Sequence, residues 1–283
     1  MSVSEQINYI IRKLHHPDGE PPVIFFDCDN CLYHRRSGVS EHMKKRIRAY
    51  FVKIGIPEDQ AASLHKKYYS EYGLAIRGLI AHHSDKVDPV DYDLKVDGGL
   101  PLDELLRPDP QLRRMLETIP RGVKKWVFTN AGEAHARRCL RILGIDDLFD
   151  GITYCDYSKP GFHCKPELPY YEQAMQEAGV KDPRRCILID DSLVNILAAR
   201  EFGWHAVHVT DPVVTDDPRF VINTITDLPK ALPELWETPS ESEANTKTHP
   251  STSDKNIRVD ARVDSYMTGA GPAAKTEKVA AGY

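Results

Sequence analysis

Residues 23–33 spell Val-Ile-Phe-Phe-Asp-Cys-Asp-Asn-Cys-Leu-Tyr, so that four apolar residues run directly into two carboxylates, Asp27 and Asp29. A short apolar run introduced by two prolines is typical of a strand buried on both faces, as in parallel sheets. Open α/β sheets place their ligands at the carboxyl ends of such strands. The two carboxylates are therefore candidates for cation binding or for nucleophilic and proton-transfer roles. On this stretch alone, a solvated turn explains the Asp and Asn residues as well.

The length and composition fit one or two globular domains. The chain has 283 residues, of which 41% are hydrophobic, and a net charge of -5. Because nucleic-acid-binding domains are usually basic, we do not expect a nucleic acid polymer as partner. A small phosphorylated substrate remains compatible with this charge if the site itself is locally positive.

Neither an export signal nor a membrane span is expected. The first twenty residues carry charges throughout, and no window of 18 apolar residues exists. The six cysteines are irregularly spaced, which favours reduced thiols and a location in the cytoplasm or nucleus. Cys28 and Cys31 form a C-x-x-C, a pattern that elsewhere marks a redox pair or half of a zinc site. The sequence offers no second C-x-x-C and no H-x-x-x-H to complete such a site.

Residues 37–107 have helical periodicity and contain no convincing strand. Ser40 is expected to cap a helix that ends at Gly55, and Pro57 to begin a helix that ends at Gly73. Residues 74–83 are also predicted helical, followed by a softer, Asp-rich segment. Because this block follows the first strand and precedes the remaining strands, we interpret it as an inserted cap domain that closes over an active site.

Strands and helices alternate from residue 108 onward. Strands are expected at 125–128, 151–154, 186–189 and 206–209, and helices at 111–119, 133–143, 167–178 and 195–202. This alternation predicts a parallel, doubly wound α/β sheet. The expected organisation is a core of residues 1–36 and 108–237, a helical cap of residues 37–107, and a disordered tail of residues 238–283. A short amphipathic helix is also predicted within residues 1–20.

Polar residues follow three of the predicted strands. Asp27 and Asp29 follow the first strand, Thr129 and Asn130 follow the second, and Asp190 and Asp191 follow the strand at 186–189, while Lys165 precedes a predicted helix. Carboxylates of this kind hold Mg²⁺, and a hydroxyl with an ammonium binds phosphoryl oxygens. Each pair alone is as well explained by a helix cap, and the lysine by an ordinary surface position. Their joint occurrence, each at an element's end, favours one site.

The four segments FFDCDNCLY, VFTNA, CKP and LIDDS resemble the motifs of the haloacid dehalogenase superfamily of phosphohydrolases. The segments at residues 71–79 and 139–157 are similar to those of fungal pyrimidine 5′-nucleotidases and their phosphatase relatives. The resemblance covers about residues 22–235. It implies a phosphomonoesterase that uses Mg²⁺ and forms an aspartyl-phosphate intermediate.

The resemblance also implies roles for individual residues. Asp27 would attack phosphorus, and Asp29 would protonate the leaving oxygen and then activate water. Thr129 and Lys165 would hold phosphoryl oxygens. The metal would be bound by Asp27, the backbone carbonyl of Asp29, Asp190 and Asp191.

Two positions depart from the family's pattern. Cys31 replaces the usual Thr or Val, a change that we expect to affect packing only. Ile196 stands where many relatives have a second acid, so the metal site is expected to depend more on Asp190.

The substrate is expected to be chosen by the cap. Tyr72 and Arg77 of the cap, together with Asn130, are assigned to substrate binding, although tyrosines at helical spacing more often pack a helix. We therefore expect a nucleoside monophosphate substrate, UMP or CMP. Lysophosphatidic acid or another small phosphometabolite is the alternative substrate, and a non-catalytic regulator of the same fold is the alternative class.

Overall fold

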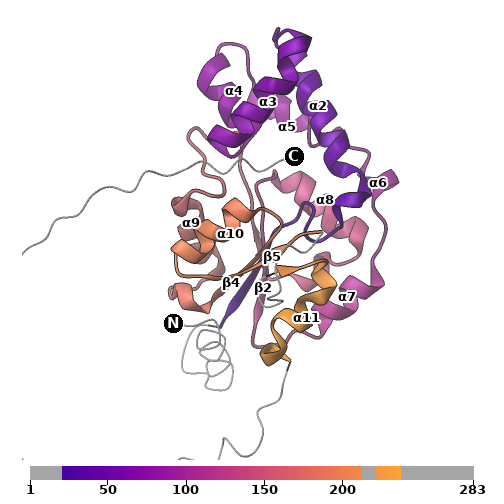
Figure 1. Ribbon diagram of the computed structural model, residues 1–283, viewed down its shortest axis with the longest axis vertical. Helices are drawn as coiled ribbons and strands as arrows, with labels where there is room; N and C mark the ends of the chain where they lie inside the picture. The colour runs from indigo at the N-terminus through magenta and orange to yellow at the C-terminus, as the bar shows by residue number, and fades with distance from the viewer. Residues whose placement is uncertain (1–20, 212–220, 237–283) are drawn as a thin grey trace, which may run out of the picture. The chain divides into compact units, whose positions relative to one another are not determined.

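The protein, seen here as a computed structural model, is described over residues 21–211 and 221–236, and it is built on one parallel sheet (Figure 1). The six strands lie in the order β3-β2-β1-β4-β5-β6, and every neighbouring pair is parallel. The strands are β1 Val23–Phe26, β2 Lys124–Phe128, β3 Gly151–Thr153, β4 Cys186–Asp190, β5 His205–Val209 and β6 Val221–Ile222. The first strand therefore lies at the centre of the sheet, between β2 and β4.

Burial on both faces explains why β1 is apolar at every position. Val23 and Phe25 belong to one buried cluster, whereas Ile24 and Phe26 belong to the other. The first cluster is covered by α9 and α10 and the second by α7, α8 and α11, which lie on opposite sides of the sheet in Figure 1. Their bounds are α7 Pro110–Glu117, α8 Glu133–Leu143, α9 Leu168–Ala178, α10 Leu193–Glu201 and α11 Leu228–Ala231. The predicted doubly wound α/β fold is confirmed.

A helical insertion separates β1 from β2. It contains α2 Val39–Lys53, α3 Glu58–Tyr72, α4 Ala75–His83, α5 Pro89–Lys95 and α6 Leu102–Leu105. A side chain at Gly78 of α4 would place its Cβ 2.2 Å from Cγ of Tyr68 in α3, so the close packing of these two helices requires glycine there. Short 3₁₀ helices lie at Arg35–Ser37, Asp146–Leu148, Pro183–Arg185, Ile225–Asp227 and Pro233–Leu235.

Helix ends account for the differences between expectation and structure. The expected N-cap Ser40 is wrong: Gly38 holds that position, and the Ser40 hydroxyl instead donates to Asn30 Oδ1 at 2.6 Å. The Asp-rich segment contains two short helices that the periodicity did not predict. The first of them, α5, begins at Pro89 because the Asp88 side chain accepts hydrogen bonds from the backbone N–H groups two and three residues later.

The remaining expectations concern the two ends of the chain, the cysteines and membrane-spanning helices. The predicted helix within residues 1–20 and the predicted disordered tail at 238–283 fall outside them. All six cysteines are free and buried. Within residues 21–211 and 221–236, no helix is both long and apolar enough to cross a membrane.

Candidate active site

The carboxyl ends of three neighbouring strands bring the predicted site residues to one edge of the sheet. Asp27 follows β1, and its backbone N–H donates to the Ile189 carbonyl at 2.8 Å, which continues the pairing of β1 with β4. Asp190 is the last residue of β4, and Thr129 follows β2. All three side chains are buried. Parallel strands that end together thus place two carboxylates and a hydroxyl at this edge, as the sequence predicted.

Lys165 connects these carboxylates. The loop before α9 carries it into the site, where the side chain is 1% exposed. Its ammonium donates to Asp27 Oδ1 at 2.8 Å, to Asp190 Oδ2 at 2.7 Å and to the Phe128 carbonyl at 2.6 Å. An ammonium has three N–H groups, so all three are engaged. Such a buried charge is tolerated because opposite charges and a carbonyl surround it.

The side-chain amide of Asn130 holds the backbone of Lys165. Its Oδ1 accepts from the Lys165 backbone N–H at 2.7 Å, and its Nδ2 donates to the Lys165 carbonyl at 2.9 Å. The two hydrogen bonds fix the loop against the end of β2. The structure therefore gives Asn130 a positioning contact with Lys165, and the substrate contact assigned to it stays a prediction.

Electrostatics at this edge favour an added cation. Burial raises the pKa of the Asp27 carboxyl well above its usual range; Lys165 opposes the shift, and Asp190 and Asp191 add to it. Burial alone would lower the pKa of Lys165, but the carboxylates of Asp190 and Asp27 outweigh it and raise that pKa, so the ammonium persists. One ammonium thus faces three carboxyl groups. A divalent cation would relieve the remaining repulsion.

The residues present fit Mg²⁺. Asp27, Asp190 and Asp191 each offer a carboxylate oxygen, and these oxygens lie within 4.8 Å of one another. An all-oxygen donor set is what Mg²⁺ prefers. Asp190 is fully buried, and its oxygens already accept from Lys165, the Ser192 N–H and Asn195 Nδ2.

Asp191 is the more accessible of the two acids after β4. Its side chain is 18% exposed, and Oδ2 lies 3.4 Å from Arg35 Nη2. Burial and the neighbouring Asp190 raise the pKa of Asp191 to about 7, against the opposing charges of Arg35 and Lys165. A carboxyl group that is hard to ionise in this environment gains most from a bound cation.

Asp29 is held away from the lysine by a second set of contacts. Its Oδ1 lies 2.7 Å from Nε2 of the buried His135, and it also accepts from the Tyr33 hydroxyl. Although burial raises the pKa of Asp29, the charge and hydrogen bond of His135 and the bond from Tyr33 lower it below its ordinary value. Burial alone would lower the pKa of His135, but Asp29 and Cys139 raise it well above its ordinary value. Both shifts favour an ionised Asp29 beside a protonated His135.

Thr129 and the cap residues have partners of their own. Thr129 Oγ1 accepts from the Ala131 N–H at 3.0 Å, which closes the turn after β2. The Tyr72 hydroxyl lies 2.7 Å from His82 Nε2 within the insertion. Arg77 Nη1 donates to Glu167 Oε1 at 2.5 Å and to Cys164 Sγ at 3.3 Å, so it reaches the loop that carries Lys165.

The contacts of Asp29 and Asp191 include residues that the sequence analysis missed. His135 lies in the first turn of α8, just after the VFTNA segment, and Arg35 and Tyr33 follow the first motif closely. Proximity to the motifs was the only signal for them. The predicted core residues lie together. Among the described residues, the side-chain hydrogen-bond partners of Tyr72 and Arg77 are His82, Cys164 and Glu167 rather than the carboxylates at the strand ends.

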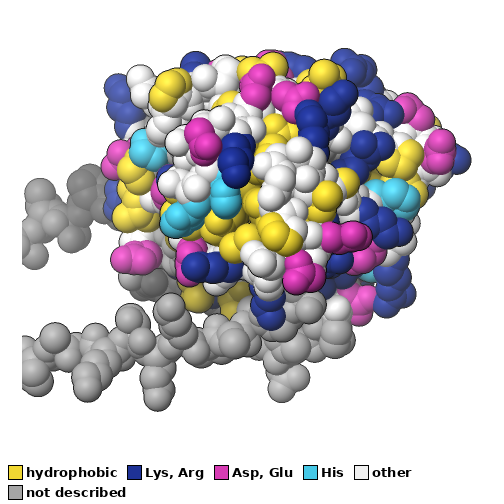
Figure 2. Space-filling view, turned by 90° about the horizontal axis from the view of Figure 1, so that it is seen from above, with side chains coloured by type: hydrophobic (Ala, Val, Ile, Leu, Met, Phe, Trp, Pro, Cys, Tyr) yellow, Lys and Arg dark blue, Asp and Glu magenta, His cyan; other side chains and the backbone are white. Residues whose placement is uncertain are grey.

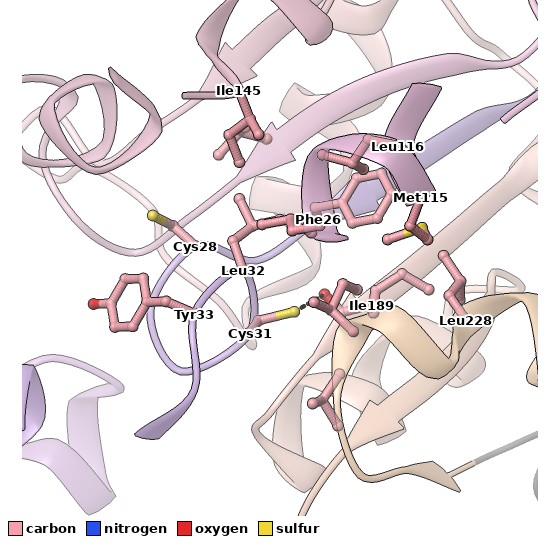
Figure 3. Close-up of a cluster of buried hydrophobic side chains, with 14 of the residues drawn as sticks. Phe26, Cys28, Cys31, Leu32, Tyr33, Met115, Leu116, Ile145, Ile189 and Leu228 are labelled. Atoms are coloured by element: carbon pink, nitrogen blue, oxygen red, sulfur yellow. Dashed lines mark hydrogen bonds between the residues drawn. The ribbon is translucent and has the colours of Figure 1, made fainter. Parts of the chain in front are cut away.

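The C-x-x-C cysteines do not face each other. Cys31 Sγ donates to the Ile189 carbonyl at 3.4 Å, and Figure 3 shows Cys28 pointing the opposite way. Cys31 is buried among apolar side chains, as expected for a packing residue. Cys28 instead lies beside Asp29 and Cys139.

Comparison with known proteins defines the class. Residues 21–203 match the model of the haloacid dehalogenase-like hydrolases. Because this match covers more than half of the chain, the protein belongs to that family, and the resemblance at superfamily level is confirmed. The narrower nucleotidase assignment stays a prediction.

Three curated relatives match between 46% and 74% of the chain. It is 37% identical over 221 residues to Phosphate metabolism protein 8 of Saccharomyces cerevisiae, which covers 74% of this chain and 68% of the relative. It is 30% identical over 145 residues to the sesquiterpene phosphatase astK of Aspergillus oryzae, a match that covers 46% of this chain and 71% of the relative. It is 25% identical over 211 residues to a glyceraldehyde 3-phosphate phosphatase of Methanothermobacter thermautotrophicus, a match that covers 66% of this chain and 84% of the relative.

Replacement of Lys165 tests the electrostatics of the site. We expect Lys165→Met to lower the free energy of unfolding by about 3–5 kcal/mol without metal, because it leaves two buried carboxylates without their cation. Mg²⁺ should restore part of this loss, since the metal replaces the missing charge. Urea unfolding with and without Mg²⁺ measures both effects.

Lys124→Met is the matched control for that experiment. Lys124 donates a single hydrogen bond to the Ala178 carbonyl at 2.8 Å. Its replacement should cost about 1 kcal/mol and respond little to Mg²⁺. Equal losses in the two variants, or a Lys165→Met variant insensitive to Mg²⁺, would contradict the charge balance described above.

Proposed function

We propose that the protein is a Mg²⁺-dependent phosphomonoesterase that hydrolyses the pyrimidine nucleoside 5′-monophosphates UMP and CMP to nucleoside and phosphate. The observation that carries this proposal is the second carboxylate, Asp29, held by His135 two residues after the buried Asp27. A halide leaving group needs no proton, whereas the alkoxide of a phosphate ester does. An acid at this position therefore favours phosphate ester hydrolysis.

Asp27 and Asp29 take different roles in the proposed reaction. A carboxylate oxygen of Asp27 attacks phosphorus and forms the aspartyl phosphate, while the bond from phosphorus to the ribose oxygen breaks. Asp29 passes to that oxygen a proton taken from the His135 imidazole across their hydrogen bond, and the proton that Asp29 later takes from water returns to the imidazole. Asp29 then takes a proton from water as the water oxygen attacks the same phosphorus, which releases phosphate and restores the Asp27 carboxylate.

The other site residues stabilise charge. Lys165 and Thr129 would hold phosphoryl oxygens, for which the lysine exchanges one of its three present hydrogen bonds, and Asn130 keeps Lys165 in place through its backbone. Asp27, Asp190, Asp191 and the backbone carbonyl of Asp29 would hold Mg²⁺. When bound, the metal offsets negative charge on the phosphoryl group.

The insertion supports a small polar substrate. We take residues 37–107 as a cap domain over a core of residues 1–36 and 108–237, and Tyr72 and Arg77 as its substrate contacts. Figure 2, seen from the end that carries the insertion, shows charged side chains of both signs interspersed with apolar ones. A long-chain lipid would require a continuous apolar groove.

We place the enzyme in the cytoplasm or nucleus, on the basis of its free cysteines.

A second candidate substrate keeps the same chemistry. Two relatives are named as phosphatases of a sesquiterpene and of glyceraldehyde 3-phosphate, which favours a small phosphometabolite or a lipid phosphate such as lysophosphatidic acid as the alternative. The catalytic carboxylates act in the same way on any of these esters. A non-catalytic regulator would not require the buried carboxylates and lysine to be complete.

A substrate panel tests the proposed function. Phosphate release is measured from UMP, CMP, AMP, GMP, dUMP and lysophosphatidic acid, with and without Mg²⁺, for the wild type and for Asp27→Asn. We expect UMP and CMP to be hydrolysed only with Mg²⁺ and only by the wild type, because Asn is no nucleophile here. Preference for purine nucleotides or lysophosphatidic acid would overturn the substrate, and no release from any ester would overturn the activity.

The role of His135 is tested by comparing two substrates whose leaving groups differ in their need for a proton. His135→Leu should lower kcat/KM for UMP by about 100-fold, because general acid catalysis contributes on this order. The loss should be smaller for p-nitrophenyl phosphate, whose aryl oxygen leaves without full protonation. His135→Gln retains an N–H donor and should recover part of the UMP rate. Equal losses on the two substrates would show a merely structural role.

The role of Arg77 is separated from that of its partner by two variants. Arg77→Ala removes the guanidinium, whereas Glu167→Gln removes the carboxylate that the guanidinium contacts. If Arg77 binds substrate, Arg77→Ala should raise KM for UMP about tenfold or more, and Glu167→Gln should leave KM nearly unchanged. Equal changes in the two variants, measured by steady-state kinetics, would limit Arg77 to holding the loop.

A further inference from the structure

A second cluster of metal-ligating side chains lies beside the catalytic carboxylates. Cys28 comes from the loop after β1, and Cys139 from α8. The two sulfur atoms and a carboxylate oxygen of Asp29 all lie within 4.8 Å of one another. Both cysteines are fully buried, whereas the Asp29 side chain is 31% exposed. The two sulfur atoms are therefore shielded from solvent, and the cluster is accessible to solvent on the side of Asp29.

His135 orients two members of this cluster. Its Nε2 lies 2.7 Å from Asp29 Oδ1 and 3.6 Å from Cys139 Sγ. Imidazoles and other polar groups that contact ligands in this way fix their orientation and contribute to metal affinity. The acid and the thiol are thus held together by contacts that exist without a metal.

We propose that Cys28, Cys139 and Asp29 form a binding site for Zn²⁺, with water as the fourth ligand. Ligand atoms around tetrahedral zinc are separated by about 3.3–3.8 Å, given Zn–S bonds of about 2.3 Å and Zn–O bonds of about 2.0–2.2 Å. The ligand atoms lie within 4.8 Å of one another, so closing to that spacing requires their separations to shorten by at most about 1–1.5 Å. Two thiolates with one carboxylate suit zinc and exclude Mg²⁺, which requires oxygen ligands.

This site differs from the expected zinc motif and from the magnesium site. Cys31, the partner suggested by the C-x-x-C spacing, is turned toward the Ile189 carbonyl and takes no part. The magnesium candidates are the carboxylates of Asp27, Asp190 and Asp191 and the backbone carbonyl of Asp29, all of them oxygen atoms, so the two sites share Asp29 but use different atoms of it. The sulfur ligands therefore give the second site its own selectivity.

Zinc in this site would inhibit hydrolysis, a consequence that rests on the proposed role of Asp29. A carboxylate bound to zinc can neither donate a proton to the leaving oxygen nor accept one from water. The ion would enter by the exposed side of Asp29, and its binding would release the thiol protons of the two cysteines. Mg²⁺ would not reverse the inhibition by competition, because it does not bind thiolates.

Cobalt spectroscopy of the full chain tests the site without relying on activity. Co²⁺ is added to the reduced protein in the presence of Mg²⁺, and thiolate-to-cobalt absorption and tetrahedral d–d bands are recorded; Zn²⁺ is then added to displace the cobalt. We expect the wild type to bind one equivalent with both signals. The matched control Cys31→Ser, which removes a buried cysteine of the same loop, should do the same.

Loss of either proposed sulfur ligand should abolish the signals. Cys28→Ser and Cys139→Ser should lack the thiolate band and bind zinc at least about tenfold more weakly. Circular dichroism and thermal unfolding establish that both variants are folded, and Asp29→Asn provides a third variant that keeps both cysteines and should also bind more weakly. A wild type without a thiolate band, or a band unchanged in Cys28→Ser and Cys139→Ser, would overturn the proposal.

Inhibition is measured separately, on whichever phosphate ester the enzyme hydrolyses. Zn²⁺ should inhibit the wild type and Cys31→Ser at an excess of Mg²⁺, and at least about tenfold more should be needed for Cys139→Ser. Equal inhibition of all three would place zinc at the aspartate cluster and overturn the inhibitory role. If no ester is hydrolysed, the proposed function fails, while the cobalt spectra still decide the site.

Discussion

The ammonium of Lys165, buried between the carboxylates of Asp27 and Asp190, is the interaction on which the rest of the site depends. Two acids at the ends of adjacent parallel strands would repel each other in a buried environment. A single lysine with all three N–H groups engaged makes their proximity tolerable. One ammonium does not balance the three carboxyl groups of Asp27, Asp190 and Asp191, and this imbalance makes the edge of the sheet receptive to a divalent cation.

A second buried basic group, His135, has a different task. His135 contacts Asp29 rather than Asp27, and the Asp29 carboxylate raises the pKa of the imidazole against the effect of burial. Lys165 and His135 thus keep two carboxylates, only two residues apart in the sequence, in separate environments. Separation of this kind allows neighbouring acids to take different catalytic roles.

The fold could be predicted because its strands and helices carry strong local signals. The run at Val23 is apolar at every position since β1 is buried on both faces, and Gly144 and Gly179 end their helices in left-handed conformations that favour glycine. The site residues at strand ends followed from the same reasoning, because parallel strands end at one edge. The short helix α5 was missed because seven residues are too few to establish a helical period.

Contacts between distant segments could not be predicted from local patterns. The sequence does not show that His135 contacts Asp29, or that the Asn130 side chain forms hydrogen bonds with the backbone of Lys165. Nor does it show that Cys28 lies beside Cys139 instead of Cys31. These partners are set by how α8 and the loop before α9 pack on the sheet. Spacing along the chain suggested the nearer cysteine, whereas the turn after β1 directs the two side chains apart.

The amide of Asn130 has a further consequence for how this enzyme could diversify. It ties the lysine to the end of β2, so every group that holds Lys165 belongs to the sheet or to the loops at its edge. The inserted helices contribute no hydrogen bond to that ammonium among those described. Most substitutions between residues 39 and 105 therefore leave the hydrogen bonds of that ammonium in place, whereas changes at Arg77, which contacts Cys164 and Glu167 beside the lysine, reach its loop directly.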